Sequence, residues 1–244
     1  DGQSQLALRA ARELVQQVPE DMLRTQADTL DAFMPIVLHV LVRFGRWEDI
    51  LQEPEPASYL PVSRCLWHYA RALAYAATGR VAEAEAEQVA FLNVRETVPP
   101  ASALFQNPSR DILGVAEAMM AGEIAYRRGE FDLAFEQLRE AVRRDDALNY
   151  DEPWGWMQPA RHALGALLLE QGHVDEAAAV YRADLKRHPH NVWALHGLAE
   201  CLDRHGHTSI AAAVRAEFDR FATRADVTVD RSCYCRQTSA VPQK

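Results

Sequence analysis

A recurring glycine constrains what this chain can fold into more than any other feature. Gly45 and Gly79 are 34 residues apart, as are Gly172 and Gly206, and the steps that join them through Gly129 are 50 and 43 residues. The position five residues after each glycine is aliphatic and mostly small: Ile50, Ala84, Ala134, Ala177 and Ala211. The repeat predicts helix pairs that stack on their neighbours, because no pair can bury its apolar stripe alone.

The residues before each glycine indicate how the helices of a pair pack. A glycine after the last turn favours the left-handed conformation that ends a helix. Seven positions earlier most pairs have a small residue, which lets two helices approach closely: Ala72, Gly122, Gly165 and Ala199, with Leu38 in the first pair. A 34-residue unit of two helices is typical of tetratricopeptide repeats (TPR). We therefore expect an all-α, right-handed solenoid of about five helix pairs.

The repeat places the helices and divides the chain. We expect pairs at 28–44 with 46–52, 62–78 with 80–93, 111–128 with 130–146, 159–171 with 174–187, and 191–205 with 208–223. Residues 94–110 and 149–158 are expected to be insertions. In the second insertion, Trp154 and Trp156 either cover the groove as a lid or fill a gap between repeats as a wedge. Residues 1–226 form the solenoid and 227–244 a tail, whose end is expected to be disordered.

A helix at 4–18 precedes the first pair without a partner. Gly2 is followed five residues later by Ala7, which is the spacing seen after the other glycines. This helix therefore reads as the second half of a repeat, and we expect the chain to be a fragment of a longer array. Its apolar face would be exposed or covered by the missing repeats or by another copy. Localisation stays open between cytoplasm and periplasm, because any targeting signal would lie upstream.

Charge and hydropathy exclude two classes of partner. Asp and Glu outnumber Lys and Arg by 35 to 26, for a formal net charge of −9. Nucleic-acid binding needs a basic surface, so we expect no nucleic-acid partner. No apolar run approaches the ~18 residues of a membrane span.

Several segments resemble a known group of proteins. They are Arg43-Phe-Gly-Arg-Trp-Glu-Asp-Ile, Leu66-Trp-His-Tyr-Ala-Arg-Ala-Leu-Ala, Tyr150-Asp-Glu-Pro, Trp156 and Trp193-Ala-Leu-His-Gly-Leu. Through them residues 2–226 resemble the C-terminal half of longer bacterial tetratricopeptide repeat proteins. In that group a second proline tends to follow Glu-Pro, where this chain has Trp154. The resemblance implies the fold and a similar number of repeats before residue 1, and it implies no particular chemistry.

The first helices of the pairs are expected to line a concave face. Side chains thirteen, ten, six, three and two residues before each glycine should point inward, and they are apolar in the first pairs but polar and aromatic later. We expect this face to bind a peptide or partner protein, with Arg127 and Arg204 as charged anchors. The candidate ligand-binding residues, including the inserted tryptophan, are Glu123, Tyr126, Arg127, Trp156, Trp193, Glu200 and Arg204.

An alternative function is a transition-metal site. His162 and His196 occupy equivalent positions in adjacent pairs, and Cys233 and Cys235 in the tail could complete a zinc or copper site, with a binding or catalytic role. The competing interpretation is a polar concave surface with two exposed thiols in a frayed tail. Neither the His-x-x-x-His nor the Cys-x-x-Cys spacing occurs, and no motif for nucleophilic catalysis or nucleotide binding is present. The sequence therefore leaves open whether the protein is an enzyme.

Overall fold

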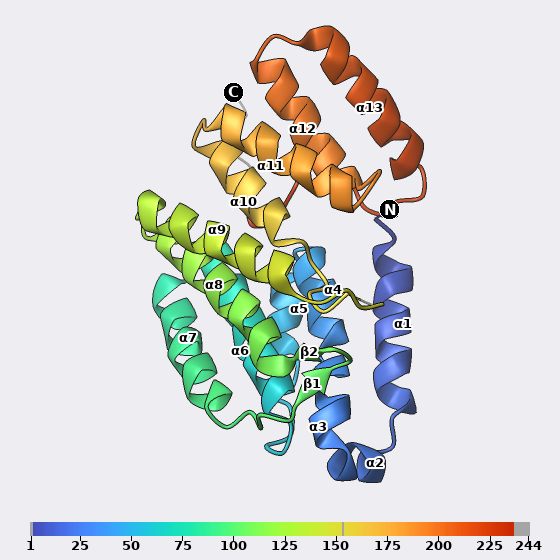
Figure 1. The fold of residues 1–244 in the computed structure, drawn as a ribbon, viewed down its shortest axis with the longest axis vertical. Helices are drawn as coiled ribbons and strands as arrows, with labels where there is room; N and C mark the ends of the chain where they lie inside the picture. The colour runs from blue at the N-terminus through green and yellow to red at the C-terminus, as the bar shows by residue number, and fades with distance from the viewer. Residues whose placement is uncertain (1, 153, 237–244) are drawn as a thin grey trace.

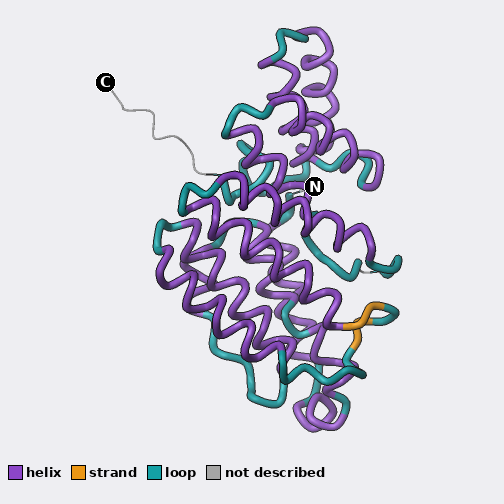
Figure 2. Tube along the Cα trace, turned by 60° about the vertical axis from the view of Figure 1, so that its left-hand side comes forward, coloured by secondary structure: helices purple, strands orange, loops and turns teal. Residues whose placement is uncertain are grey.

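Over the residues that the structure describes, the regular secondary structure is helical apart from one hairpin with strands of two residues each. The computed structural model describes residues 2–152 and 154–236 (Figure 1). The last residues of the predicted tail, 237–244, lie outside this described part. Within it the helices of each pair pack side by side, and successive pairs stack obliquely along the molecule (Figure 2).

The predicted pairs are confirmed. The first pair is α4 (Ile36–Arg43) with α5 (Trp47–Gln52), the second α6 (Pro61–Ala77) with α7 (Val81–Arg95), the third α8 (Ser109–Arg127) with α9 (Phe131–Ala147), the fourth α10 (Ala160–Glu170) with α11 (Val174–Arg187), and the fifth α12 (Val192–Arg204) with α13 (Thr208–Ala222).

The repeated glycines end the first helix of each pair as the sequence predicts. All of them have positive φ, between 61° and 84°, in the left-handed region where a side chain is costly. In every pair the N–H of the residue after the glycine donates to a carbonyl five residues earlier, as from His173 to Leu168 at 2.9 Å. This is the Schellman hydrogen bond, which satisfies a carbonyl that the helix leaves open. Each recurring glycine in the sequence therefore marks the end of the first helix of a pair.

The first long helix differs from the expectation because it is broken. Residues 28–44 form α3 (Ala27–Leu30), a 3₁₀ turn at Asp31–Phe33, and α4, and a further short helix, α2 (Glu20–Thr25), precedes them. Pro35 has no N–H to donate to the carbonyl of Asp31, so the helical hydrogen-bond pattern is interrupted there, which accounts for the break. The larger insertion is not an unstructured loop, since it pairs β1 (Ala103–Leu104) with β2 (Asn107–Pro108).

Aspartates from neighbouring segments cap several helices whose first N–H groups have no partner within the helix. Asp31 accepts hydrogen bonds from the N–H groups of Val62 (2.7 Å) and Ser63 (2.9 Å) at the start of α6. Asp145 accepts one from Ala160 N (3.2 Å) at the start of α10. These bonds satisfy donors that would otherwise be buried without acceptors.

The first helix, α1 (Ser4–Gln17), is capped from the far end of the chain and packs on α4. The carboxylate of Asp226 accepts hydrogen bonds from Ser4 N (2.7 Å) and Gln5 N (2.9 Å). Asp226 N in turn donates to Gly2 O at 3.1 Å. Figure 1 shows the consequence, with the start of α1 lying beside the end of α13. The outer face of α1 stays open, with Leu6 48% and Leu14 41% exposed.

The two insertions fasten to each other and bury a tryptophan. Asn107 Nδ2 donates to Asp151 Oδ2 (2.5 Å) and to Asn149 O (3.0 Å), which joins the hairpin to the second insertion. Trp156 is 2% exposed, and its ring meets the rings of His39 and Tyr69 edge-on, each at 5.4 Å between centroids. The second insertion therefore acts as a wedge and not as a lid.

The wedge predicts a large difference between two neighbouring tryptophans. Trp156→Ala removes a buried indole and should lower the free energy of unfolding by about 3–5 kcal/mol. Trp154→Ala is the matched control, because Trp154 is 44% exposed, and it should cost about 1 kcal/mol or less. Chemical denaturation monitored by circular dichroism measures both. Similar effects of the two substitutions would contradict the wedge.

Asp145 predicts a specific pH dependence of stability. Burial raises the pKa of Asp145 to about 6, whereas an unfolded aspartate titrates near ~3.9. The folded state therefore holds a proton that the unfolded state has released, and this group's contribution to stability falls as pH rises from about 4 to 6.

The variant Asp145→Asn cannot ionise, yet it keeps an oxygen that can accept from Ala160 N. It should become more stable than the wild type by about 1–3 kcal/mol above pH 6, and the difference should shrink towards pH 4. Denaturation curves of both proteins between pH 4 and 8 measure it. A difference that does not change with pH would show that Asp145 is ionised in the fold throughout this range.

Candidate binding site on the inner face

The inner face, formed by α4, α6, α8, α10 and α12, is occupied by the chain's own C-terminal segment. We define this segment as residues 225–236. It leaves the end of α13, caps α1 through Asp226, and then crosses the inner face. Val229, Ser232, Cys233 and Cys235 are each at most 8% exposed. Over this stretch the tail is part of the packed structure, so the interpretation of two exposed thiols in a frayed tail is wrong.

Two cysteines form the apolar anchor of the segment. Cys233 and Cys235 are joined by a disulfide bond. Side chains from five helices surround the pair, and only about 20 Å³ of space remains between them. The helical residues are Val42, Trp47, Leu73, Ala77, Met119, Glu123 and Ala163. The bond places apolar sulfur on a mostly apolar surface and leaves neither cysteine as a free thiol.

Polar contacts fix the segment on either side of the disulfide. Arg127 donates a hydrogen bond to the carbonyl of Cys235. Arg236 forms a bidentate ion pair with Glu200 of α12, at 2.7 and 3.0 Å. Paired N–H···O bonds between guanidinium and carboxylate are among the stronger polar contacts in proteins and also fix orientation. Helix α8 therefore binds the backbone of the segment at Cys235, and helix α12 binds the charged side chain of Arg236.

Gly45 makes room for the aromatic residue of the segment. A Cβ atom at Gly45 would lie 2.6 Å from the Cβ of Tyr234, closer than real carbon atoms approach. The Tyr234 hydroxyl donates to Thr228 O at 3.1 Å, which closes a compact turn within the segment. Gly45 is thus required both for its positive φ and for contact with the segment.

Tyr181 of α11 reaches the segment through a gap between two first helices. A Cβ atom at Gly165 would lie 2.7 Å from the Tyr181 ring, and a Cβ at Gly197 would also overlap it. The hydroxyl of Tyr181 shares a hydrogen bond with Ser232. The glycine spacing predicts the small residue at 165, but Tyr181 itself has no sequence signal as a groove residue, because it lies on a second helix.

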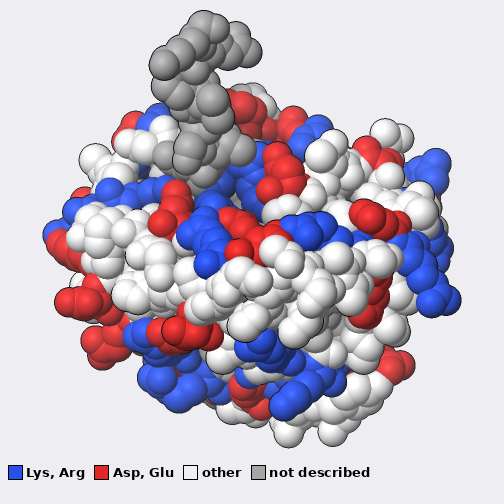
Figure 3. All heavy atoms as spheres, turned by 90° about the horizontal axis from the view of Figure 1, so that it is seen from above, with Lys and Arg blue, Asp and Glu red and all other residues white. Residues whose placement is uncertain are grey.

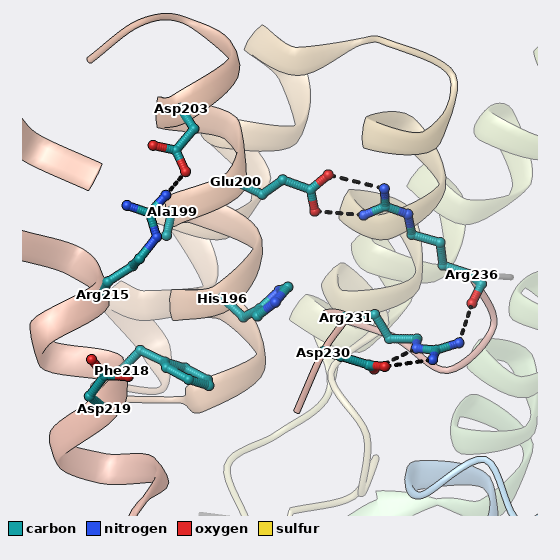
Figure 4. Close-up of a pocket in the computed structure, with 10 residues that line it drawn as sticks. All are labelled: His196, Ala199, Glu200, Asp203, Arg215, Phe218, Asp219, Asp230, Arg231 and Arg236. Atoms are coloured by element: carbon teal, nitrogen blue, oxygen red, sulfur yellow. Dashed lines mark hydrogen bonds and ion pairs between the residues drawn. The ribbon is translucent and has the colours of Figure 1, made fainter. Parts of the chain in front are cut away.

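A pocket of about 530 Å³ opens beside the segment, between α12 and α13. Figure 4 shows His196 and Glu200 pointing from α12 towards the C-terminal segment. The arginines around it are paired: Arg215 with Asp203, Arg231 with Asp230 at 2.7 Å, and Arg236 with Glu200. The pocket therefore offers mixed, internally compensated charge.

His196 provides a polar group without a partner at this pocket. Its Nδ1 is buried and makes no hydrogen bond with the described residues, while its ring lies 5.8 Å from that of Phe218. Burial lowers the pKa of His196, although Glu200 and Asp230 act in the opposite direction. The lowered pKa favours the neutral imidazole, and its Nδ1 is a buried polar atom without a partner at the wall of the pocket.

His162 is committed to a buried hydrogen-bond chain. Arg43 Nη1 lies 2.7 Å from His162 Nδ1, and His162 Nε2 lies 2.9 Å from Asp184 Oδ2. An arginine can only donate, so Nδ1 accepts and Nε2–H donates to the carboxylate. Burial lowers the pKa of His162, which is consistent with this neutral tautomer. Both ring nitrogens are occupied, so neither is free for a metal.

Some of the predicted ligand-binding residues hold or orient contacts of the C-terminal segment, and the others contact residues of the helical array. Arg127 and Glu200 hold the segment directly, and Glu123 orients Arg127 through an ion pair at 2.7 Å. Trp193 lies under the guanidinium of Arg43, whose carbon is 3.7 Å from the indole centroid. The remaining three have partners outside the C-terminal segment. Tyr126 donates a hydrogen bond to Glu170, and Arg204 donates to Leu169 O and Glu200. Trp156 is the buried residue of the second insertion and packs on His39 and Tyr69.

The four predicted metal ligands do not converge. His162 is bonded to Arg43 and Asp184, His196 faces the pocket, and Cys233 and Cys235 form their disulfide. Across residues 2–152 and 154–236, no group of three or more His, Cys, Asp or Glu side chains could hold a metal ion. The geometry gives the zinc or copper hypothesis no support.

Charges of both signs are mixed on one end of the molecule. Figure 3, seen from the α12–α13 end, shows Lys and Arg interspersed with Asp and Glu on this face. None of the helices that the structure describes is long and apolar enough to cross a bilayer.

Comparison of the chain with protein-family models found no match, and comparison with curated proteins found no match either. The fold and the site therefore define the class of protein here: an array of paired helices whose inner face holds an extended segment of polypeptide.

The ion pair between Glu200 and Arg236 predicts measurable coupling. Glu200 also pairs with Arg204 at 2.7 Å, within the same helix, and this more exposed pair is a matched control. A double-mutant cycle of Glu200→Ala with Arg236→Ala should give about 1 kcal/mol of coupling energy, and the cycle with Arg204→Ala about 0.3–0.5 kcal/mol. Equal coupling in the two cycles would mean that the segment is not held at Glu200 in solution.

Proposed function

We propose that this protein is a tetratricopeptide-type helical repeat module that binds an extended polypeptide segment of a partner on its inner face. In this proposal the C-terminal segment is an intramolecular ligand of the same face, and the partner competes with it. Support for the repeat type comes from the 34-residue glycine spacing and the Schellman bond that ends each first helix.

One observation carries the proposal: the inner face holds residues 225–236 as a receptor holds a peptide. The segment has no regular secondary structure, and its contacts come from several helices far apart in sequence. They comprise an apolar contact at the disulfide, a carbonyl bonded by Arg127, and a basic side chain paired with Glu200. Buried apolar anchors with oriented polar contacts are the usual composition of a peptide-binding surface.

These contacts describe the partner that the face fits. A competing segment would place a compact apolar side chain where the disulfide lies and a backbone carbonyl at Arg127. It would present a basic residue to Glu200, and its polar groups could extend to His196 in the adjoining pocket. We therefore infer an extended, mixed-charge peptide with an arginine or lysine near its apolar residue.

The proposal is tested by turning the internal ligand into a separate peptide. A protease site inserted between Thr223 and Arg224, both exposed, allows cleavage after the protein has folded. The released peptide should exchange reversibly, and a labelled, oxidised peptide of residues 224–236 should bind the emptied protein saturably in fluorescence anisotropy. The peptide variant Arg236→Ala should bind about 5–10-fold more weakly, because it loses the pair with Glu200.

Arg231→Ala is the control peptide, since the contacts of Arg231 are with Asp230, Tyr234 and Arg236 of the segment itself. It should bind within about twofold of the unmodified peptide. If cleavage unfolds the helices, or if the peptide never exchanges, the inner face is a closed core and the proposal is wrong.

A further inference from the structure

The disulfide lies where the C-terminal segment meets the inner face, and its chemistry controls how well the segment can dock. Cys233 and Cys235 are 6% and 8% exposed. Cys235 also carries the carbonyl that Arg127 binds, and Cys235 N donates to Cys233 Sγ at 3.2 Å. The covalent bond and the principal contacts of the segment therefore belong to the same three residues.

We propose that the C-terminal segment is a redox-controlled occupant of the inner face, docked when Cys233 and Cys235 are joined and released when a dithiol reduces them. This rests on the proposed function, because it names the regulation of the same binding face. The oxidised state therefore competes with a partner peptide more strongly, roughly 10-fold, than the reduced state does.

The physical basis is preorganisation. The disulfide closes a three-residue loop, which holds Tyr234 at its tip against Gly45 and directs the Cys235 carbonyl towards Arg127. A free segment with the bond intact already has this turn, whereas a reduced one must order it upon docking. The chain-entropy relation for a three-residue loop gives roughly a 10-fold weaker docking after reduction.

The reaction balances with an external dithiol as the reductant. One thiolate of the reductant attacks a sulfur of the Cys233–Cys235 bond and forms a mixed disulfide, and its second thiolate then displaces the protein sulfur. The protein gains two electrons and two protons as two thiols, and the reductant becomes a disulfide. Neither Cys65 nor Cys201 takes part, since both are buried without a disulfide.

Docking and reduction are thermodynamically linked. The sulfurs are buried while the segment is docked, so a dithiol reaches them chiefly in the undocked state. Anything that weakens docking should accelerate reduction, and a partner that displaces the segment should do the same. Reduction in turn should raise the apparent affinity of the inner face for that partner.

Hydrogen exchange of the full chain, measured by mass spectrometry with and without dithiothreitol, tests the proposal. Amides of residues 228–236 should exchange about 10-fold faster after reduction, while those of α6 and α8 stay protected. Cys233→Ser/Cys235→Ser should show the fast exchange in both conditions. Cys65→Ala/Cys201→Ala is the matched control and should keep the full response. Equal protection of the segment before and after reduction would overturn the proposal.

The rate of reduction supplies a second test that does not need the cysteine variants. Arg236→Ala should speed the reduction of the intact chain by dithiothreitol several-fold, and Arg139→Ala, whose ion pair with Glu176 does not involve the segment, should leave the rate unchanged. Identical rates in all three proteins would contradict the linkage.

Peptide binding separates this proposal from the proposed function. If the oxidised and reduced peptides of residues 224–236 bind the emptied protein equally, redox control is wrong and the binding function stands. If neither binds, the binding function itself fails.

Discussion

The hydrogen bond from Arg43 to His162 joins the first helix pair to the fourth, and the closed inner face depends on it. Arg43 also lies over Trp193 of the fifth pair. Burial lowers the pKa of Arg43 to about 10, so its side chain is still charged at pH 7. A desolvated charge must be paired or bonded. His162 passes this interaction to Asp184, and the chain of contacts draws the two ends of the array together.

The contacts of Arg43 bring the first helix pair close to the fourth and fifth pairs, and the packing of the remaining interior depends on this arrangement. Once α4 lies near α10 and α12, the surface between them can enclose a short segment on several sides. Trp156 fills the gap on one side of Tyr69, and the C-terminal segment fills the surface between Gly45, Arg127 and Glu200. Asp226, just after α13, then joins this end of the array to the start of α1 by capping it.

Under the proposed function, the C-terminal segment would compete with a partner for the inner face. An intramolecular ligand acts at an effective concentration set by its short connection, which commonly reaches the millimolar range. A partner would then gain access only where docking of the segment is weakened or where the partner binds considerably more tightly. In the proposal the disulfide near the end of the segment switches this docking, while the ion pair of Arg236 with Glu200 contributes to it in both redox states.

The helix pairs and their ends follow from the sequence alone, because each recurring glycine, at 34-residue steps or at longer steps with an insertion, acts through local backbone conformation. The register on first helices also placed Arg127 and Glu200 on the inner face, and Trp156 as a wedge was one of two alternatives that the sequence left open. The contact of Arg43 with His162, the passage of Tyr181 between Gly165 and Gly197, and the position of the tail on the inner face come from the tertiary structure. These contacts join residues far apart in the chain and depend on how the pairs stack, which no local pattern encodes. Separation along the chain is also the reason why the metal-site prediction found no support. Equivalent positions in adjacent pairs suggested that His162 and His196 lie near each other. The partners of each side chain, however, come from other helices.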